Sequence, residues 1–226
     1  MRSYADLLTG PRLRLVLALL VAGGALMVFA LLAEDLLTND PIVEVDQRIE
    51  TTLQDHRTAA LTVAFRAAST VGSAFVLVPL AVVVVAYLLW RERRFDALLV
   101  AVAVGGAELI TIGLKAAFDR DRPFLPDPLA MESSASFPSG HASVSLALYG
   151  ALALLLAEHT SNARRAAYAI VALALVVAIG FSRLYLGVHF LSDVLAGYSA
   201  GLFWLAISVA TVRAAAARRA SSGRCG

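Results

Sequence analysis

The chain has 226 residues, of which 59% are hydrophobic and 16% are charged, and its formal net charge is +2. Soluble domains are usually about 45–50% apolar, so the composition argues against an ordinary soluble protein. The small net charge says little about partners, and we expect no nucleic acid among them. The single cysteine, Cys225, excludes an intramolecular disulfide and lies too near the end to head a four-residue prenylation motif, so we interpret it as an incidental residue.

Six apolar segments are long enough to cross a bilayer, because a helix of about 20 apolar residues spans a hydrocarbon core of about 30 Å. In chain order they cover residues 15–33, 71–90, 95–118, 141–157, 166–182 and 194–212. The first is longer than the apolar region of a signal peptide and lacks a cleavage site. The sequence therefore predicts an all-α, polytopic membrane protein. It is expected to be a six-transmembrane-helix bundle, with residues 1–226 forming a single integral membrane domain.

The segment 41–68, between the first two spans, is amphipathic. Ile42, Val45, Ile49 and Leu53 recur at helical spacing, with charged residues between them. This pattern predicts a short interfacial helix that lies along the membrane surface. A solvated loop is the alternative.

Arginine clusters indicate the orientation, because short basic segments remain in the cytoplasm. The clusters are Arg2, Arg12 and Arg14; Arg91, Arg93 and Arg94; Arg164 and Arg165; and Arg213, Arg218, Arg219 and Arg224. In a six-span chain all of these lie on one side, so both termini are predicted to be cytoplasmic. Segments 115–122 and 182–193 then carry basic residues on the outer side, against the usual bias. A bound anion would explain them.

Two polar residues after the fifth span have the spacing of a catalytic pair. His189 and Asp193 are four residues apart, which on a helix puts their Cβ atoms about 5–6 Å apart. The carboxylate can fix the imidazole tautomer, so that the other ring nitrogen presents a lone pair for nucleophilic or base catalysis. A His–Asp pair without chemistry is the alternative.

The outer ends of the other spans supply groups that suit phosphate. Ser139, Gly140 and His141 stand at the predicted start of the fourth span, where free N–H groups bind anions and a histidine can donate a proton. A plain helix cap by Ser139 is the alternative. Lys115, Arg122 and Arg183 can neutralise phosphate oxygens, although basic residues near a membrane surface also occur without a ligand.

Together these residues resemble the tripartite signature of the type-2 phosphatidic acid phosphatase and vanadium haloperoxidase superfamily. The matching residues are Lys115 with Arg122-Pro123, then Pro138-Ser139-Gly140-His141, then Ser182-Arg183 with His189 and Asp193. The resemblance covers about residues 70–212. It implies a lipid phosphate phosphatase of the cell membrane with no metal or other cofactor. The predicted topology puts the three segments at the outer face.

The resemblance also implies a role for each residue. His189 would attack phosphorus and form a phosphohistidine, Asp193 would orient His189, and His141 would protonate the leaving group. The phosphate would be bound by Lys115, Arg122, Ser139, Gly140 and Arg183. The candidate substrates are undecaprenyl or another polyprenyl pyrophosphate, phosphatidic acid, diacylglycerol pyrophosphate and phosphatidylglycerophosphate, and family analogy favours the first. A lipid-to-lipid phosphotransferase and a non-catalytic lipid binder are the alternatives, and the sequence does not fix the oligomeric state.

Several residues outside the signature positions also have expected roles. Glu108, in the third span, is a functional candidate by default, but we favour a residue that faces the bundle and is paired in its core. Arg120 and Tyr185 are expected to flank the site, and Asp119 and Asp121 to moderate its positive charge. The glycines at 105, 106, 197 and 201 are expected to permit close helix packing.

Overall fold

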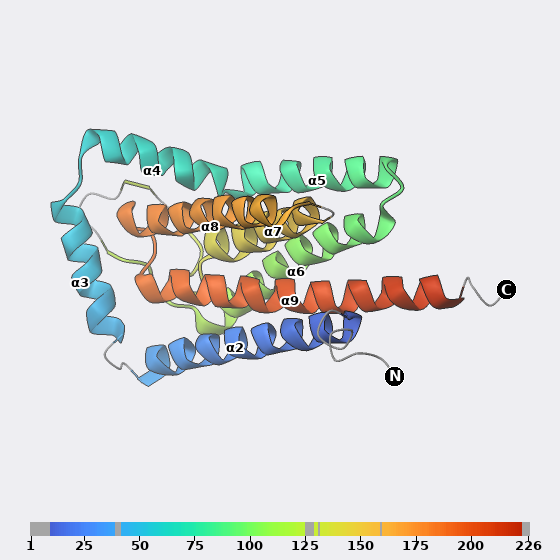
Figure 1. Ribbon diagram of the computed structural model, residues 1–226. Coiled ribbons are helices and arrows are strands. Elements are labelled where there is room, and N and C mark those ends of the chain that lie inside the picture. The colour runs from blue at the N-terminus through green and yellow to red at the C-terminus, as the bar shows by residue number, and fades with distance from the viewer. Residues whose placement is uncertain (1–9, 39–41, 125–128, 131, 159, 223–226) are drawn as a thin grey trace.

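A computed structural model describes residues 10–38, 42–124, 129–130, 132–158 and 160–222. These described residues form eight helices and no strand (Figure 1). The helices are α2 (Pro11–Thr38), α3 (Ile42–Asp55), α4 (Ala59–Val71), α5 (Ala74–Trp90), α6 (Arg94–Phe118), α7 (Gly140–Ala157), α8 (Asn162–Tyr185) and α9 (Leu191–Ser222). Three residues used above, Arg2, Arg224 and Cys225, lie outside the described residues, as do 125–128 and 131.

The prediction of an all-α, six-span membrane bundle is confirmed. Within the described residues, α2, α6, α7, α8 and α9 are each long and apolar enough to cross a membrane. The sixth span is a broken one, because α4 and α5 pass the same test only as a pair, bent by 41°.

The predicted interfacial segment 41–68 divides into two parts, α3 and most of α4. Only α3 lies across the end of the bundle, whereas α4 packs along α8. Thr58 begins α4 by accepting a hydrogen bond from the Leu61 N–H at 3.3 Å. At the bend, a Cβ on Gly72 would lie 2.2 Å from a methyl group of Ile179, so the close approach of α4 to α8 requires glycine there.

Close packing of α9 against α7 positions the polar residues at one end of the bundle. A Cβ on Gly197 would lie 2.5 Å from the Ser139 carbonyl oxygen, and one on Gly201 would lie 2.5 Å from that of Ser143. The predicted packing role therefore fits these glycines, and it fits Gly106, which contacts the Trp204 ring. It is wrong for Gly105, where an added Cβ would meet nothing within 4 Å.

The two ends of the bundle differ in structure. At the site end, α3 crosses over the end of α8 and the start of α9, while the start of α2 and the end of α9 lie at the opposite end (Figure 1). Ion pairs join α6, α7 and α9 at that opposite end: Arg93 to Asp96 at 2.7 Å, Arg213 to Asp96 at 3.1 Å and Arg93 to Glu158 at 3.1 Å. The chemistry-bearing residues gather at the site end.

Candidate active site

His189 lies in the short loop that joins α8 to α9 and is almost fully buried. Gly187 allows the reversal of the chain, because its φ of 73° is in the left-handed region that favours glycine. Asp193, in the first turn of α9, brings its Oδ2 to 3.3 Å from the His189 Nδ1. The same oxygen accepts the Phe190 N–H at 2.9 Å.

The surroundings of His189 define its protonation. Burial lowers the pKa of His189 to about 4, outweighing the hydrogen bond to Asp193 that raises it. The imidazole is therefore neutral at neutral pH. Arg122 Nη1 lies 3.3 Å from Nε2, and because a guanidinium can only donate, Nε2 must accept. The proton then sits on Nδ1, facing Asp193, and the Nε2 lone pair is the one available for chemistry.

The predicted cations converge from two helices and one loop. Arg122 donates to the carbonyl oxygens of Val188 at 2.6 Å and Ser134 at 2.7 Å. Lys115 Nζ donates to the Ala135 carbonyl oxygen, and Arg183 donates to Ser69 and to Glu132. These bonds fix each positive group by backbone or side-chain partners.

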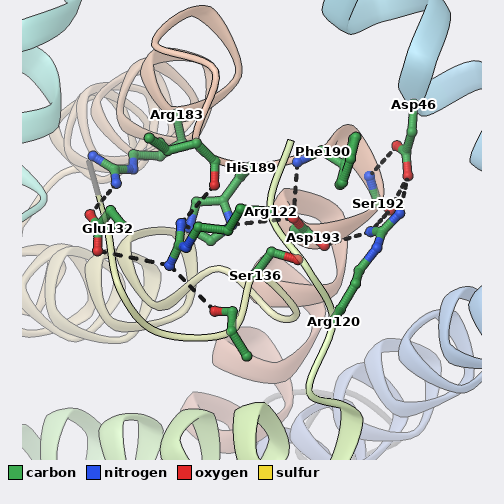
Figure 2. A network of polar contacts seen from close by, with 12 residues as sticks. Asp46, Arg120, Arg122, Glu132, Ser136, Arg183, His189, Phe190, Ser192 and Asp193 are labelled. Atoms are coloured by element: carbon green, nitrogen blue, oxygen red, sulfur yellow. Dashed lines mark hydrogen bonds and ion pairs between the residues drawn. The ribbon is translucent and has the colours of Figure 1, made fainter. Parts of the chain in front are cut away.

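Glu132 is a residue of the site that no sequence pattern indicates. Its carboxylate pairs with Arg183, and its Oε2 lies 3.8 Å from Arg122 Nη2 (Figure 2). The loop around Glu132 has no hydrophobic periodicity or motif, so no sequence signal marked this residue. An anion thus already lies between two of the cations that we expect to bind phosphate.

The start of α7 contributes the predicted Pro-Ser-Gly-His segment. The Ser139 N–H donates to the Asp193 carbonyl oxygen at 2.9 Å, which ties this segment to α9. The Ser139 hydroxyl is fully buried, makes no cap to α7, and has no hydrogen-bond partner among the described residues. It does not have the helix-cap role, and a buried hydroxyl without a partner is suited to a ligand.

One cavity is lined by several of these groups, although Ser139 and Arg183 are not among its lining residues. It has a volume of about 760 Å³, and Lys115, Arg122, His141 and His189 line its polar end. Gly140 lines it as well. The rest of the cavity runs along apolar side chains of α5 and α6, among them Leu77, Ala81, Val85, Val104 and Leu109.

Glu108 lines the same cavity. It is exposed, and none of the described residues gives it a hydrogen bond or an ion pair. The prediction that Glu108 is paired within the core is therefore wrong.

Arg120 and Tyr185 play different parts from those expected. Arg120 is not among the residues that line the cavity. It bridges Asp193 to Asp46 of α3 (Figure 2). The Tyr185 hydroxyl accepts the Thr58 N–H at 2.9 Å and so anchors the start of α4. Asp119 ends α6 in a left-handed conformation, with a φ of 41°, and the Asp121 carbonyl oxygen accepts the Ser136 hydroxyl at 2.9 Å.

Asp46 is a second residue outside the predicted site, although the sequence contains a signal that it is buried. Its position is four residues after Ile42 and three before Ile49, so it shares the apolar face of the amphipathic helix. A carboxylate on that face must be buried with a partner.

Comparison with known proteins adds sequence and structural likeness. A model described as the PAP2 superfamily matches residues 96–216, which include all three signature segments. Phosphatidylglycerophosphatase B from Bacillus subtilis (strain 168) is 39% identical over 134 residues, or 58% of this chain and 65% of that protein. The match thus spans slightly less than two thirds of that relative's length.

Two solved structures are similar to this fold. The crystal structure of the first transmembrane PAP2 type phosphatidylglycerolphosphate phosphatase from Bacillus subtilis gives a TM-score of 0.77 at 31% identity, over 83% of this chain and 93% of that one. Aquifex aeolicus LpxE gives a TM-score of 0.58 at 26% identity, over 73% of this chain and 94% of that one.

Proposed function

Because the chain is a multi-pass membrane protein of the PAP2 superfamily, we propose that it hydrolyses the terminal phosphate of a membrane lipid. The main support for this proposal is the cavity, in which cations and histidines lie at one end of an apolar groove. A lipid phosphate has the same two parts in the same order. Its charged group would meet Lys115 and Arg122 while its hydrocarbon chain lies along α5 and α6.

The proposed reaction has two steps. The Nε2 lone pair of His189 forms a bond to phosphorus as the bond from phosphorus to the leaving oxygen breaks, and His141 gives that oxygen a proton. Water then attacks the phosphohistidine and returns a proton to His141, which releases inorganic phosphate and restores the His189 lone pair. The tautomer imposed by Asp193 and Arg122 supports His189 as the nucleophile.

Phosphate binding is assigned to the remaining signature residues. Lys115, Arg122 and Arg183 would stabilise the charge on the equatorial oxygens, which is the main requirement of phosphoryl transfer. The unpartnered hydroxyl of Ser139 and the glycine backbone at 140 would add hydrogen bonds. Because Arg183 and Arg122 face Glu132 in the free protein, a phosphate has to displace that carboxylate.

The relatives bear on the substrate. The Bacillus subtilis relative and the Bacillus subtilis crystal structure both carry names that refer to phosphatidylglycerophosphate. We therefore place that lipid first, ahead of the polyprenyl pyrophosphate that family analogy favours. Phosphatidic acid and diacylglycerol pyrophosphate remain in the same chemical class. The order is tested directly by comparing kcat/KM across these lipids.

We also propose that the site faces the outer side of the membrane and that both termini are cytoplasmic. Arg91 and Arg93 lie in the short loop between α5 and α6, and Arg94 is the first residue of α6. Arg164 and Arg165 lie in the first turn of α8, next to the short loop that follows α7. Such loops remain inside, and the site lies at the other ends of the same helices. A lipid headgroup would then enter sideways from the outer leaflet.

The decisive experiment is phosphate release by the purified protein from mixed micelles of each candidate lipid, with a chelator present throughout. We expect His189→Ala to lower kcat by roughly 10³-fold or more. When catalytic residues act together, the loss of any one of them removes most of the activity. His56→Ala is the matched control, since His56 is an exposed histidine at the end of α3. Phosphate released in labelled water must carry the label, and transfer to a second lipid instead would contradict hydrolysis.

A further inference from the structure

Arg120 connects two buried carboxylates that come from distant parts of the chain. Its Nη1 lies 2.6 Å from Asp193 Oδ1, and its Nη2 lies 2.9 Å from Asp46 Oδ2. Both carboxylates have side chains that are 0% exposed, and the Arg120 side chain is 11% exposed. The fork of the guanidinium therefore holds α3 and α9 in one arrangement, as Figure 2 shows.

Asp46 is bonded to α9 as well as to Arg120. Its Oδ1 accepts the Ser192 N–H at 2.9 Å, and its Oδ2 accepts the Ser192 hydroxyl. Ser192 is in the first turn of α9, where N–H groups are free and a negative charge is favourable. Asp46 thus acts as a cap supplied by another helix, and it fixes the turn that carries Asp193.

Each oxygen of Asp193 has its own partners. Oδ2 faces His189 and the Phe190 N–H, whereas Oδ1 faces Arg120. A carboxylate turns easily about its terminal bond, so the bond at Oδ1 decides where Oδ2 points. The Phe190 ring covers the guanidinium, with its centroid 4.3 Å from the Arg120 Cζ, and shields this contact.

We infer that Asp46 and Arg120 are positioning residues for the proposed nucleophile, acting through Asp193. In this arrangement α3 forms part of the catalytic apparatus as well as a surface element. The inference rests on the proposed phosphatase function. It goes beyond the signature, because Asp46 lies outside the matched residues 96–216 and Arg120 is not one of the signature positions.

A stabilising role alone would be a weaker explanation. Buried ion pairs contribute little net stability, because desolvation offsets the attraction. Their geometry is specific, however, and a misplacement of about 1 Å at a reacting group can cost roughly 100-fold in rate. Removal of one partner also destabilises a buried pair, so the test has to separate the loss of kcat from the loss of stability.

The test is a double-mutant cycle on the full-length protein, with phosphate release as the readout. We expect Asp46→Asn and Arg120→Gln each to lower kcat roughly 10- to 100-fold with little change in KM. The matched control is Glu44→Gln, which removes a carboxylate from the exposed face of the same helix, where Glu44 pairs with Arg48 at 3.5 Å. It should keep wild-type kcat.

Combination with Asp193→Asn separates positioning from folding. If the clamp acts through Asp193, the Asp46→Asn and Asp193→Asn double variant should be no slower than Asp193→Asn alone. Multiplicative losses, or a fall in thermal stability that accounts for the lost activity, would overturn the inference. If Asp46→Asn does not fold, the same cycle with Arg120→Gln decides. If the wild-type protein is inactive on every lipid, the proposed function itself is refuted. Failure of the inference and failure of the proposed function are therefore distinguishable.

Discussion

The fold suppresses the charge of His189, and this has a consequence for stability. Burial lowers the pKa of His189 from 6.5 to about 4. Below pH 6.5 the unfolded chain therefore binds a proton that the folded chain does not. Stability must fall as pH falls from neutral towards the folded pKa and then stop changing on this account.

We expect the wild-type protein to lose on the order of 2 kcal/mol from this group between about pH 7.5 and pH 5. The measurement is thermal unfolding in detergent at both pH values. His189→Asn removes the titrating group. Between the same two pH values this variant should therefore lose less stability than the wild type, by the amount that His189 contributes. Equal losses in both proteins would show that His189 is not held neutral by the fold.

Glu132 competes with substrate for positive charge. Its carboxylate pairs with Arg183 and lies 3.8 Å from Arg122, where we expect the phosphate to bind. Glu132→Gln should therefore lower KM and the inhibition constant of vanadate about fivefold, which corresponds to roughly 1 kcal/mol. A weaker binding of vanadate would indicate that Glu132 holds the arginines in place for substrate.

At the scale of helices, the contact of α9 with α7 sets the site geometry. Gly197 faces the Ser139 carbonyl oxygen, which would lie 2.5 Å from an added Cβ. This neighbour is backbone, so it cannot rotate away, and Gly197→Ala must move a helix. We expect a loss of about 1–3 kcal/mol, or about 2–4 °C in Tm per kcal/mol, together with reduced activity.

Gly24→Ala is the control for that variant. Gly24 also lies in a spanning helix, α2, but an added Cβ there meets nothing within 4 Å. Alanine should leave Tm unchanged or raise it, because it favours helix over glycine by about 1 kcal/mol. A Tm of the Gly197 variant equal to that of the Gly24 variant would contradict the close-packing role.

The helices themselves were predictable because each span is a long apolar run, and a bilayer requires that length whatever the neighbouring helices do. The bend between α4 and α5 was not, because Gly72 has meaning only once Ile179 of α8 lies against it. The signature residues could be selected by spacing. Glu132 could not, since its two partners, Arg122 and Arg183, are brought to it only by tertiary structure.

For the whole molecule, the membrane orientation gives a direct prediction. In a Cys225→Ser background, a cysteine at Ser133 should react with an impermeant maleimide from outside intact cells. A cysteine at Asn162, at the start of α8, should react only after the membrane is opened. Both positions are exposed, so a difference reports sidedness. Reaction of the Asn162 variant in intact cells would reverse the orientation and contradict the outer-leaflet substrate.

The shape of the cavity has a further consequence for the direction of the reaction. One end is polar and the other runs between apolar faces of α5 and α6, so the two products of the proposed reaction would leave into different phases. Inorganic phosphate dissolves into the aqueous compartment and is diluted there, whereas the dephosphorylated lipid stays in the bilayer. The products then rarely meet at one site, so re-synthesis is suppressed by partitioning. The proposed reaction would therefore run in the direction of hydrolysis without any regulatory site that binds product.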